Sequence, residues 1–202
     1  MIKIENVDTY GWQAAIRGMR NPKNSWDKSD SGESGIGYAV GDNDLKLMKT
    51  LAAAGTDHGK YLRMITVTAD ITAPLYWWKE YDTYKVGTVA NSCSTMHKIQ
   101  AKEFVLSDFS TDHLSETNLI ILGFTIDALN NARLDFLDNQ DKRDWWQMIQ
   151  LLPASYNQRR TVQLNYAVLK NMYHSRQNHK LDEWREFCQW VKKLPYSELI
   201  TG

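Results

Sequence analysis

A strict alternation of apolar and polar residues between Ile65 and Thr72 constrains the fold more than any other feature of the chain. The apolar positions are Ile65, Val67, Ala69 and Ile71, and the positions between them are Thr66, Thr68, Asp70 and Thr72. A period of two places the apolar set on one face of a β-strand, so the chain must contain a sheet with a packed face. Pro74 ends this strand and is suited to begin a helix, because the first helical turn does not need its missing N–H.

The remaining periodic stretches predict helices around this sheet. Expected helices cover residues 10–19, 42–54, 94–150 (with 114–137 as the longest run and 141–151 as a second helix), 152–176 and a last segment from Asp182, and a short strand covers 1–7. Residues 21–41 are rich in Asn, Ser, Asp and Gly, and are expected to form a long loop, either a lid or binding loop or a passive surface excursion. The sequence therefore predicts one α+β domain over residues 1–202, helix-rich with a small antiparallel sheet.

Charge and cysteine content limit the possible partners. Lys plus Arg and Asp plus Glu both number 24, so no net field attracts the chain to DNA, RNA or an anionic membrane, and any anion site must be local. Cys93 and Cys188 are the only cysteines, and two are not enough for a disulfide framework or a four-ligand zinc site. We therefore expect that the protein binds no metal and is located in the reducing cytoplasm. The longest apolar run, from Leu119 to Phe124, is far short of the ~20 residues that span a bilayer.

Asn165 and Arg176 are the most functional-looking pair in the expected helix 152–176. Eleven steps of about 100° place them roughly 20° apart, with Leu169 and Met172 between them on the same face. An amide and a permanent cation on an apolar face suit an anionic, hydrogen-bonding ligand. On spacing alone the structural alternative is favoured, because an Arg also complements the C-terminal end of a helix dipole and an Asn can face solvent.

Two stretches resemble the flavin-dependent thymidylate synthases. Leu152, Pro153, Asn165 and Arg176 match that family's C-terminal nucleotide-binding segment, in which Leu-Pro is followed by an Asn and a dUMP-contacting Arg. Residues 71–81 are similar to the strand end and Pro-started helix that precede the family signature. The resemblance implies an α+β fold, a homotetramer with shared active sites, FAD as cofactor, and reductive methylation of dUMP to dTMP with a folate as carbon donor.

The signature itself is altered. The family has Arg-His-Arg, seven residues and then Ser, whereas this chain has Thr83-Tyr84-Lys85, seven residues and then Cys93. His58 matches the first His of a flavin-contacting run whose other residues differ, and Ala167 stands where the family has a further Arg. The nucleotide side is thus partly retained and the flavin side is largely changed.

The resemblance assigns roles to particular residues. Arg176 would bind and polarise the nucleotide, and His58, Lys85 and Asn165 would hold the cofactor. Arg160, near the start of the expected helix, would either bind a phosphate or simply face solvent at a turn. The solvent-facing interpretation is favoured. Cys93 and Ser94 would touch substrate, although a small buried thiol is the favoured interpretation of Cys93.

Three functions remain open at this level. The first is an FAD-dependent thymidylate synthase-type enzyme that acts on a pyrimidine deoxynucleotide. The second is a nucleotide-binding protein that keeps the fold but has lost FAD, which the missing Arg-His-Arg favours. The third is a purely oligomeric interaction protein, favoured if Trp78 or Tyr84 fills the pocket.

Overall fold

The structure, a computed structural model, describes residues 2–35 and 37–202, so Met1 of the expected first strand lies outside the described residues. The chain divides into two compact units. The α4–α5 unit contains residues 1–3, 71–83 and 91–160, and the α6–α7 unit contains residues 4–70, 84–90 and 161–202. The single domain expected over residues 1–202 stays a prediction.

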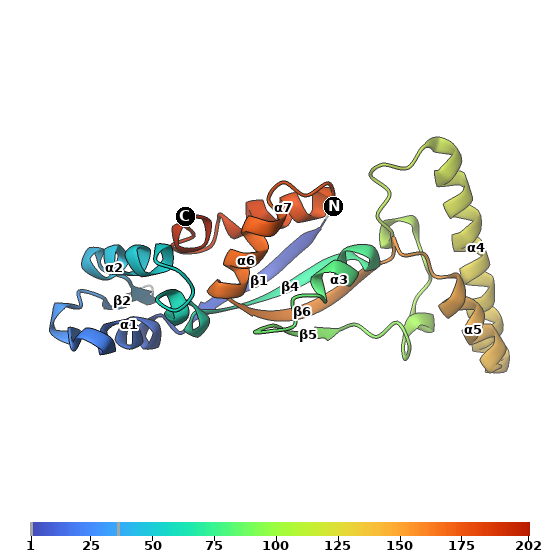
Figure 1. Cartoon of the computed structure of the whole chain (residues 1–202). Coiled ribbons are helices and arrows are strands. Elements are labelled where there is room, and N and C mark those ends of the chain that lie inside the picture. Colours follow the sequence, from blue (N-terminus) through green and yellow to red (C-terminus); the bar gives the residue numbers. More distant parts are fainter. Residues whose placement is uncertain (1, 36) are drawn as a thin grey trace. The chain divides into compact units, whose positions relative to one another are not determined.

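A small antiparallel sheet is built from four strands in the order β1-β4-β6-β5 (Figure 1). The strands are β1 (Lys3–Tyr10), β4 (Thr66–Pro74), β5 (Val89–Ser92) and β6 (Asn157–Asn165). In β4 the alternation has the expected effect, since Val67, Ala69 and Ile71 are buried and the residues between them are half-buried. The prediction of a helix-rich α+β fold with a small antiparallel sheet is confirmed.

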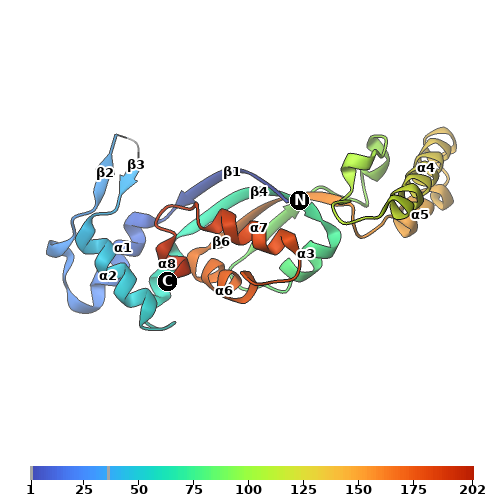
Figure 2. The same cartoon turned by 90° about the horizontal axis from the view of Figure 1, so that it is seen from above.

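Helices cover one face of the strands in the α6–α7 unit (Figures 1 and 2). The helices of this unit are α1 (Trp12–Arg20), α2 (Asp42–Ala53), α6 (Tyr166–Arg176), α7 (Asp182–Val191) and α8 (Glu198–Thr201), with a 3-10 segment at Gly59–Met64. Leu169 and Met172 of α6 are fully buried, as are Trp184 and Phe187 of α7. The apolar stripes of these two helices therefore form the core above the strands.

The expected helix over 152–176 is wrong in its first half. Residues 157–165 form strand β6, and α6 begins only at Tyr166. Gln158, Val162 and Leu164 are the buried residues of β6, and their even spacing is that of a strand. Asn165 is the N-cap of α6, where its side-chain oxygen accepts a hydrogen bond from the Val168 N–H at 3.0 Å.

The expected loop 21–41 is more ordered than its composition predicts. It contains 3-10 turns at Asn21–Lys23 and Trp26–Lys28, and an antiparallel hairpin of β2 (Gly32–Ser34) and β3 (Gly37–Ala39) in which Gly32 pairs with Ala39. The Asp30 carboxylate accepts from the N–H groups of Asn43 and Asp44 at 2.8 and 3.0 Å, and therefore caps α2 from outside the helix.

A buried ion pair holds this loop in place. The Arg20 Nε lies 2.6 Å from the Asp44 Oδ1, and both side chains are almost fully buried. The other Asp44 oxygen accepts from the hydroxyls of Ser29 and Ser31 at 2.6 and 2.7 Å. Burial acts to raise the pKa of Asp44, but the bonds from Ser29, Ser31 and Arg20 outweigh it and lower the pKa.

The α4–α5 unit is built on a helical hairpin. Its helices are α3 (Leu75–Tyr81), α4 (Glu116–Asn139) and α5 (Lys142–Leu151), and α4 and α5 lie side by side (Figure 1). Their core consists of Ile99, Phe104, Phe109, Leu122, Ile126, Leu129, Ala132 and Met148.

The helix expected over 94–115 is wrong, because this segment forms only 3-10 turns at Ile99–Ala101 and Leu106–Asp108. Its polar side chains bind the backbone instead. The Ser94 hydroxyl accepts from the N–H groups of Met96 and His97, and the Asp108 carboxylate accepts from that of Val105. Among the described residues, none of the helices is long and apolar enough to cross a membrane.

Candidate functional site

A cavity of about 690 Å³ lies at the start of α6 in the α6–α7 unit, and we call it the α6 cavity. Its walls combine apolar side chains with amides and cations, chiefly Ala52, Leu62, Val86, Val168, Asn165, Asn171, Arg63, Lys170 and His174. Apolar walls with a few convergent polar groups are typical of a small-molecule site, and the volume falls in the range of roughly 300–1,000 Å³ of such sites.

Helix α6 supplies one complete wall of this cavity. Ala167, Lys170, Asn171 and His174 follow one another at helical spacing and all line it. The Lys170 Nζ donates to the Ala52 carbonyl at 3.0 Å, which fixes this cation against α2. The sequence analysis missed Lys170, Asn171 and His174, although their spacing from Ala167 was a signal for one helix face.

Gly87 brings the backbone of the altered signature segment against Asn165. Its φ is +79°, in the left-handed region, and a Cβ there would lie 2.5 Å from the Asn165 Nδ2. Any side chain would therefore clash with the amide as well as strain the backbone. Glycine at this position keeps the α6 cavity open next to Asn165.

Arg176 does not line the α6 cavity. Its Nε donates to the Tyr84 hydroxyl at 2.9 Å, and its guanidinium carbon lies 4.9 Å from the Trp184 ring and 5.6 Å from the Tyr84 ring. The prediction that Asn165 and Arg176 share one helix face is wrong, because Asn165 caps the helix in an extended conformation. Tyr84 and Trp184 thus form a clamp around Arg176, whereas the sequence suggested Tyr84 only as a residue that could fill the pocket.

No protein-family model matches the sequence, and no curated protein matches it. Solved structures do match over nearly the whole chain. The flavin-dependent thymidylate synthase ThyX from Helicobacter pylori, complexed with FAD and dUMP, has a TM-score of 0.71 at 18% identity and covers 97% of this chain and 98% of its own. The chain has the fold of the flavin-dependent thymidylate synthases.

Two further structures agree with this assignment of the thymidylate synthase fold. Another structure of the Helicobacter pylori ThyX with FAD and dUMP has a TM-score of 0.70 at 18% identity, covering 98% of this chain and 96% of that chain. The UMP/dUMP methylase PolB from Streptomyces cacaoi, bound with 5-Br dUMP, has a TM-score of 0.63 at 14% identity, covering 98% and 93%.

Two residues that the thymidylate synthase resemblance assigned to the cofactor do not line the α6 cavity themselves. His58 and Lys85 are both exposed, and each is the chain neighbour of a lining residue, Gly59 and Val86 respectively. Asn165, the third, lines the cavity directly. The assignment of His58, Lys85 and Asn165 to a cofactor stays a prediction.

The expected substrate residues Arg160, Cys93 and Ser94 belong to the α4–α5 unit. Arg160 makes an ion pair with Asp82 at 2.8 Å, donates to the Gln158 side chain at 3.0 Å, and stacks over the Trp78 ring at 4.2 Å. These contacts fix Arg160 on β6, so its expected place near the start of a helix is wrong.

The favoured interpretation of Cys93 as a buried thiol is also wrong, because Cys93 is exposed. Its backbone holds it at the end of β5, where the N–H donates to the Arg159 carbonyl at 2.9 Å. Cys188, in contrast, is buried in α7, and burial raises its pKa to about 11. In residues 2–35 and 37–202, no group of three or more His, Cys, Asp or Glu side chains could hold a metal ion.

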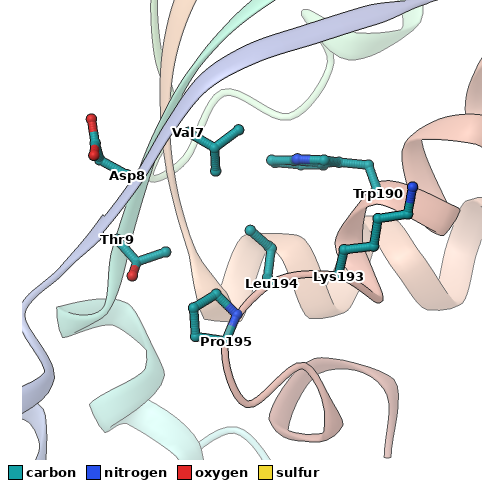
Figure 3. Close-up of a pocket in the computed structure, with 7 residues that line it drawn as sticks. All are labelled: Val7, Asp8, Thr9, Trp190, Lys193, Leu194 and Pro195. Atoms are coloured by element: carbon teal, nitrogen blue, oxygen red, sulfur yellow. The ribbon is translucent and has the colours of Figure 1, made fainter. Parts of the chain in front are cut away.

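A hollow of about 550 Å³ lies between β1 and the segment after α7 (Figure 3). Val7 and Trp190 face each other across it, whereas the Asp8 carboxylate points away (Figure 3). Leu194 and Pro195 complete an apolar wall, and Lys193 lies at its rim. With so few polar groups directed inward, this hollow offers no chemistry comparable to that of the α6 cavity.

Proposed function

We propose that the protein binds a pyrimidine deoxynucleotide of the dUMP type together with FAD and acts as a thymidylate synthase-like methyltransferase. The observation that carries this proposal is the α6 cavity, where Asn165 lies beside Gly87 in the altered signature segment. The fold supports it, because the similar ThyX structures contain FAD and dUMP.

The residues of the α6 cavity fit a flavin. Leu62, Val86 and Val168 offer apolar surface to a planar ring, and the amides of Asn165 and Asn171 can hydrogen-bond to its polar edge. Arg63 and Lys170 supply two cations for a phosphate. The reduced form of FAD, bound there, would supply a hydride for reductive methylation, with methylenetetrahydrofolate as the carbon donor.

Arg176 would act on the nucleotide. Its guanidinium can pair with a phosphate or a pyrimidine carbonyl through two N–H groups. The Tyr84 hydrogen bond and the Trp184 ring restrict its rotation, so the cation is oriented before ligand arrives. In keeping with the fold, we also propose a homotetramer.

One observation favours a second candidate, a nucleotide-binding protein without flavin chemistry. Tyr84 stands at the position of the signature histidine, and its hydroxyl contacts Arg176 instead of remaining available to a cofactor. In that case the nucleotide would bind and the FAD would not.

An FAD titration followed by flavin fluorescence tests the proposal. We expect the wild-type protein to bind FAD, and Ala167→Trp, which fills the α6 cavity, to weaken binding at least about tenfold. Ala128→Trp is the matched control, because Ala128 is an exposed residue on α4 outside the cavity, and it should bind as wild type does.

A parallel dUMP titration separates the two candidates. Binding of dUMP without FAD would favour the non-catalytic protein, and binding of neither ligand would disprove both. If FAD binds, formation of dTMP from dUMP with methylenetetrahydrofolate and a reductant then tests the reaction.

A further inference from the structure

A separate small pocket lies between α1 and residues 21–41 in the α6–α7 unit. This α1 pocket has a volume of about 260 Å³, and it shares no lining residue with the α6 cavity. Its walls carry Gln13 and Arg17 of α1 on one side, and Trp26 and Tyr38 on the other, with Arg20 among the lining residues.

Helix α1 lines the pocket with three side chains that carry hydrogen-bond donors. Gln13, Arg17 and Arg20 follow one another four and three positions apart, which places them on one helix face. Arg20 is fully engaged, because its Nε pairs with Asp44 and its two terminal nitrogens donate to the carbonyls of Ser25 and Lys28 at 3.1 and 3.0 Å. Arg20 therefore fixes the shape of the pocket without providing a charge for a ligand.

Arg17, in contrast, has its charge available. Its exposed guanidinium makes no hydrogen bond or ion pair with any residue that the structure describes, and the same is true of the Gln13 amide and the Tyr38 hydroxyl. Three polar groups from α1 and β3 thus converge on one small pocket without satisfying each other. Such convergence on a concave surface is what a ligand site requires.

The opposite wall supplies aromatic surface. Trp26 is 51% exposed, although its indole N–H donates to the Asn21 side chain at 2.8 Å. This bond anchors the edge of the indole and leaves ring surface at the pocket. Tyr38, half-buried on β3, adds a second ring. Aromatic walls of this kind suit a planar ring.

We propose that the α1 pocket binds a small planar carboxylate, a single aromatic or heteroaromatic ring that bears one carboxylate group. Arg17 is the partner of the carboxylate, because a guanidinium pairs with it through two parallel hydrogen bonds. Trp26 and Tyr38 hold the ring. A volume below the roughly 300 Å³ of the smallest usual drug-sized sites limits the ligand to one ring.

A benzoate titration of ¹⁵N-labelled protein, followed by NMR, tests this site. The signals of the Trp26 indole N–H and the Arg17 Nε–H should shift and saturate, with a dissociation constant on the order of 1 mM, as befits so small a ligand. Benzamide, which lacks the charge, and cyclohexanecarboxylate, which lacks the aromatic ring, should bind more weakly.

Two arginine variants locate the binding site. Arg17→Gln should weaken benzoate binding by about tenfold or more, since it removes a charge-assisted hydrogen bond. Arg63→Gln removes the same charge from the α6 cavity and should change the affinity less than about twofold. The NMR spectrum of each variant also shows whether the fold is retained.

Several results would overturn the proposal. These are the absence of any saturable shift, equal affinity of Arg17→Gln and wild type, and equal affinity for benzamide and benzoate. Loss of benzoate binding in Arg63→Gln alone would place the ligand in the α6 cavity instead.

Discussion

At the scale of single residues, the pair of Arg20 and Asp44 is the clearest case of charge placed where water cannot reach it. The Asp44 side chain is fully buried, and its pKa is lowered by the bonds that it accepts. A depressed carboxyl pKa stabilises the folded state above the unfolded pKa, near 3.9, and this contribution is lost as the pH falls through the lower folded pKa.

We therefore expect stability to decrease as the pH falls below about 4. Asp44→Asn should cost about 3 kcal/mol of unfolding free energy at pH 7, because it leaves Arg20 buried and unpaired. The difference in unfolding free energy between Asp44→Asn and wild type should become smaller at acid pH. Urea unfolding at several pH values measures both effects, and Asp42→Asn, at an exposed position of the same helix, is the control. A constant difference at all pH values would contradict this account.

At the scale of elements, the junction between β6 and α6 places one residue, Asn165, in both the helix cap and the candidate site. Asn165 both caps α6 and lines the α6 cavity. Asn165→Asp keeps a good capping oxygen but replaces the amide donor with a carboxylate, whereas Asn165→Ala removes both. We expect Asn165→Ala to lower stability by about 1 kcal/mol and Asn165→Asp to preserve it, while both weaken FAD binding.

Thermal unfolding and FAD titration of the two variants separate the two roles. Equal FAD affinity of Asn165→Asp and wild type would contradict the ligand role of the amide. Equal stability of Asn165→Ala and wild type would contradict the capping role.

The same junction shows how much the sequence could predict. In β4 every second residue is apolar, so its period of two was visible and the strand was predicted correctly. In β6 the buried positions include Gln158, and Arg160 is covered by Trp78 and Asp82, so the buried face does not look apolar in the sequence. Spacing and resemblance singled out Asn165, which stays a predicted site residue. The clamp on Arg176 was not predictable, because Tyr84 and Trp184 are far apart in the sequence and meet only in the folded chain.

At the scale of the whole molecule, helix α4 exposes several large apolar side chains that no other part of the described chain covers. Ile120, Ile121, Phe124 and Leu134 are exposed by 57 to 70%. The chain has no net charge that would oppose self-association, and exposed apolar patches of this kind commonly mark interfaces. This face supports the proposed homotetramer.

Light scattering after size-exclusion chromatography measures the mass of the assembly. We expect wild type to be tetrameric and Phe124→Glu to give a smaller species, because a charge on the interface must be desolvated. Val105→Glu, at another exposed apolar position of the same unit, should leave the mass unchanged. A monomeric wild-type protein would contradict the tetramer.

The close approach of Gly87 to Asn165 also limits how this chain can diverge. Position 87 combines a φ of +79° with a space in which a Cβ would lie 2.5 Å from the Asn165 Nδ2. We therefore expect that a variant of this chain can keep the Asn165 amide in its present place only if position 87 stays glycine.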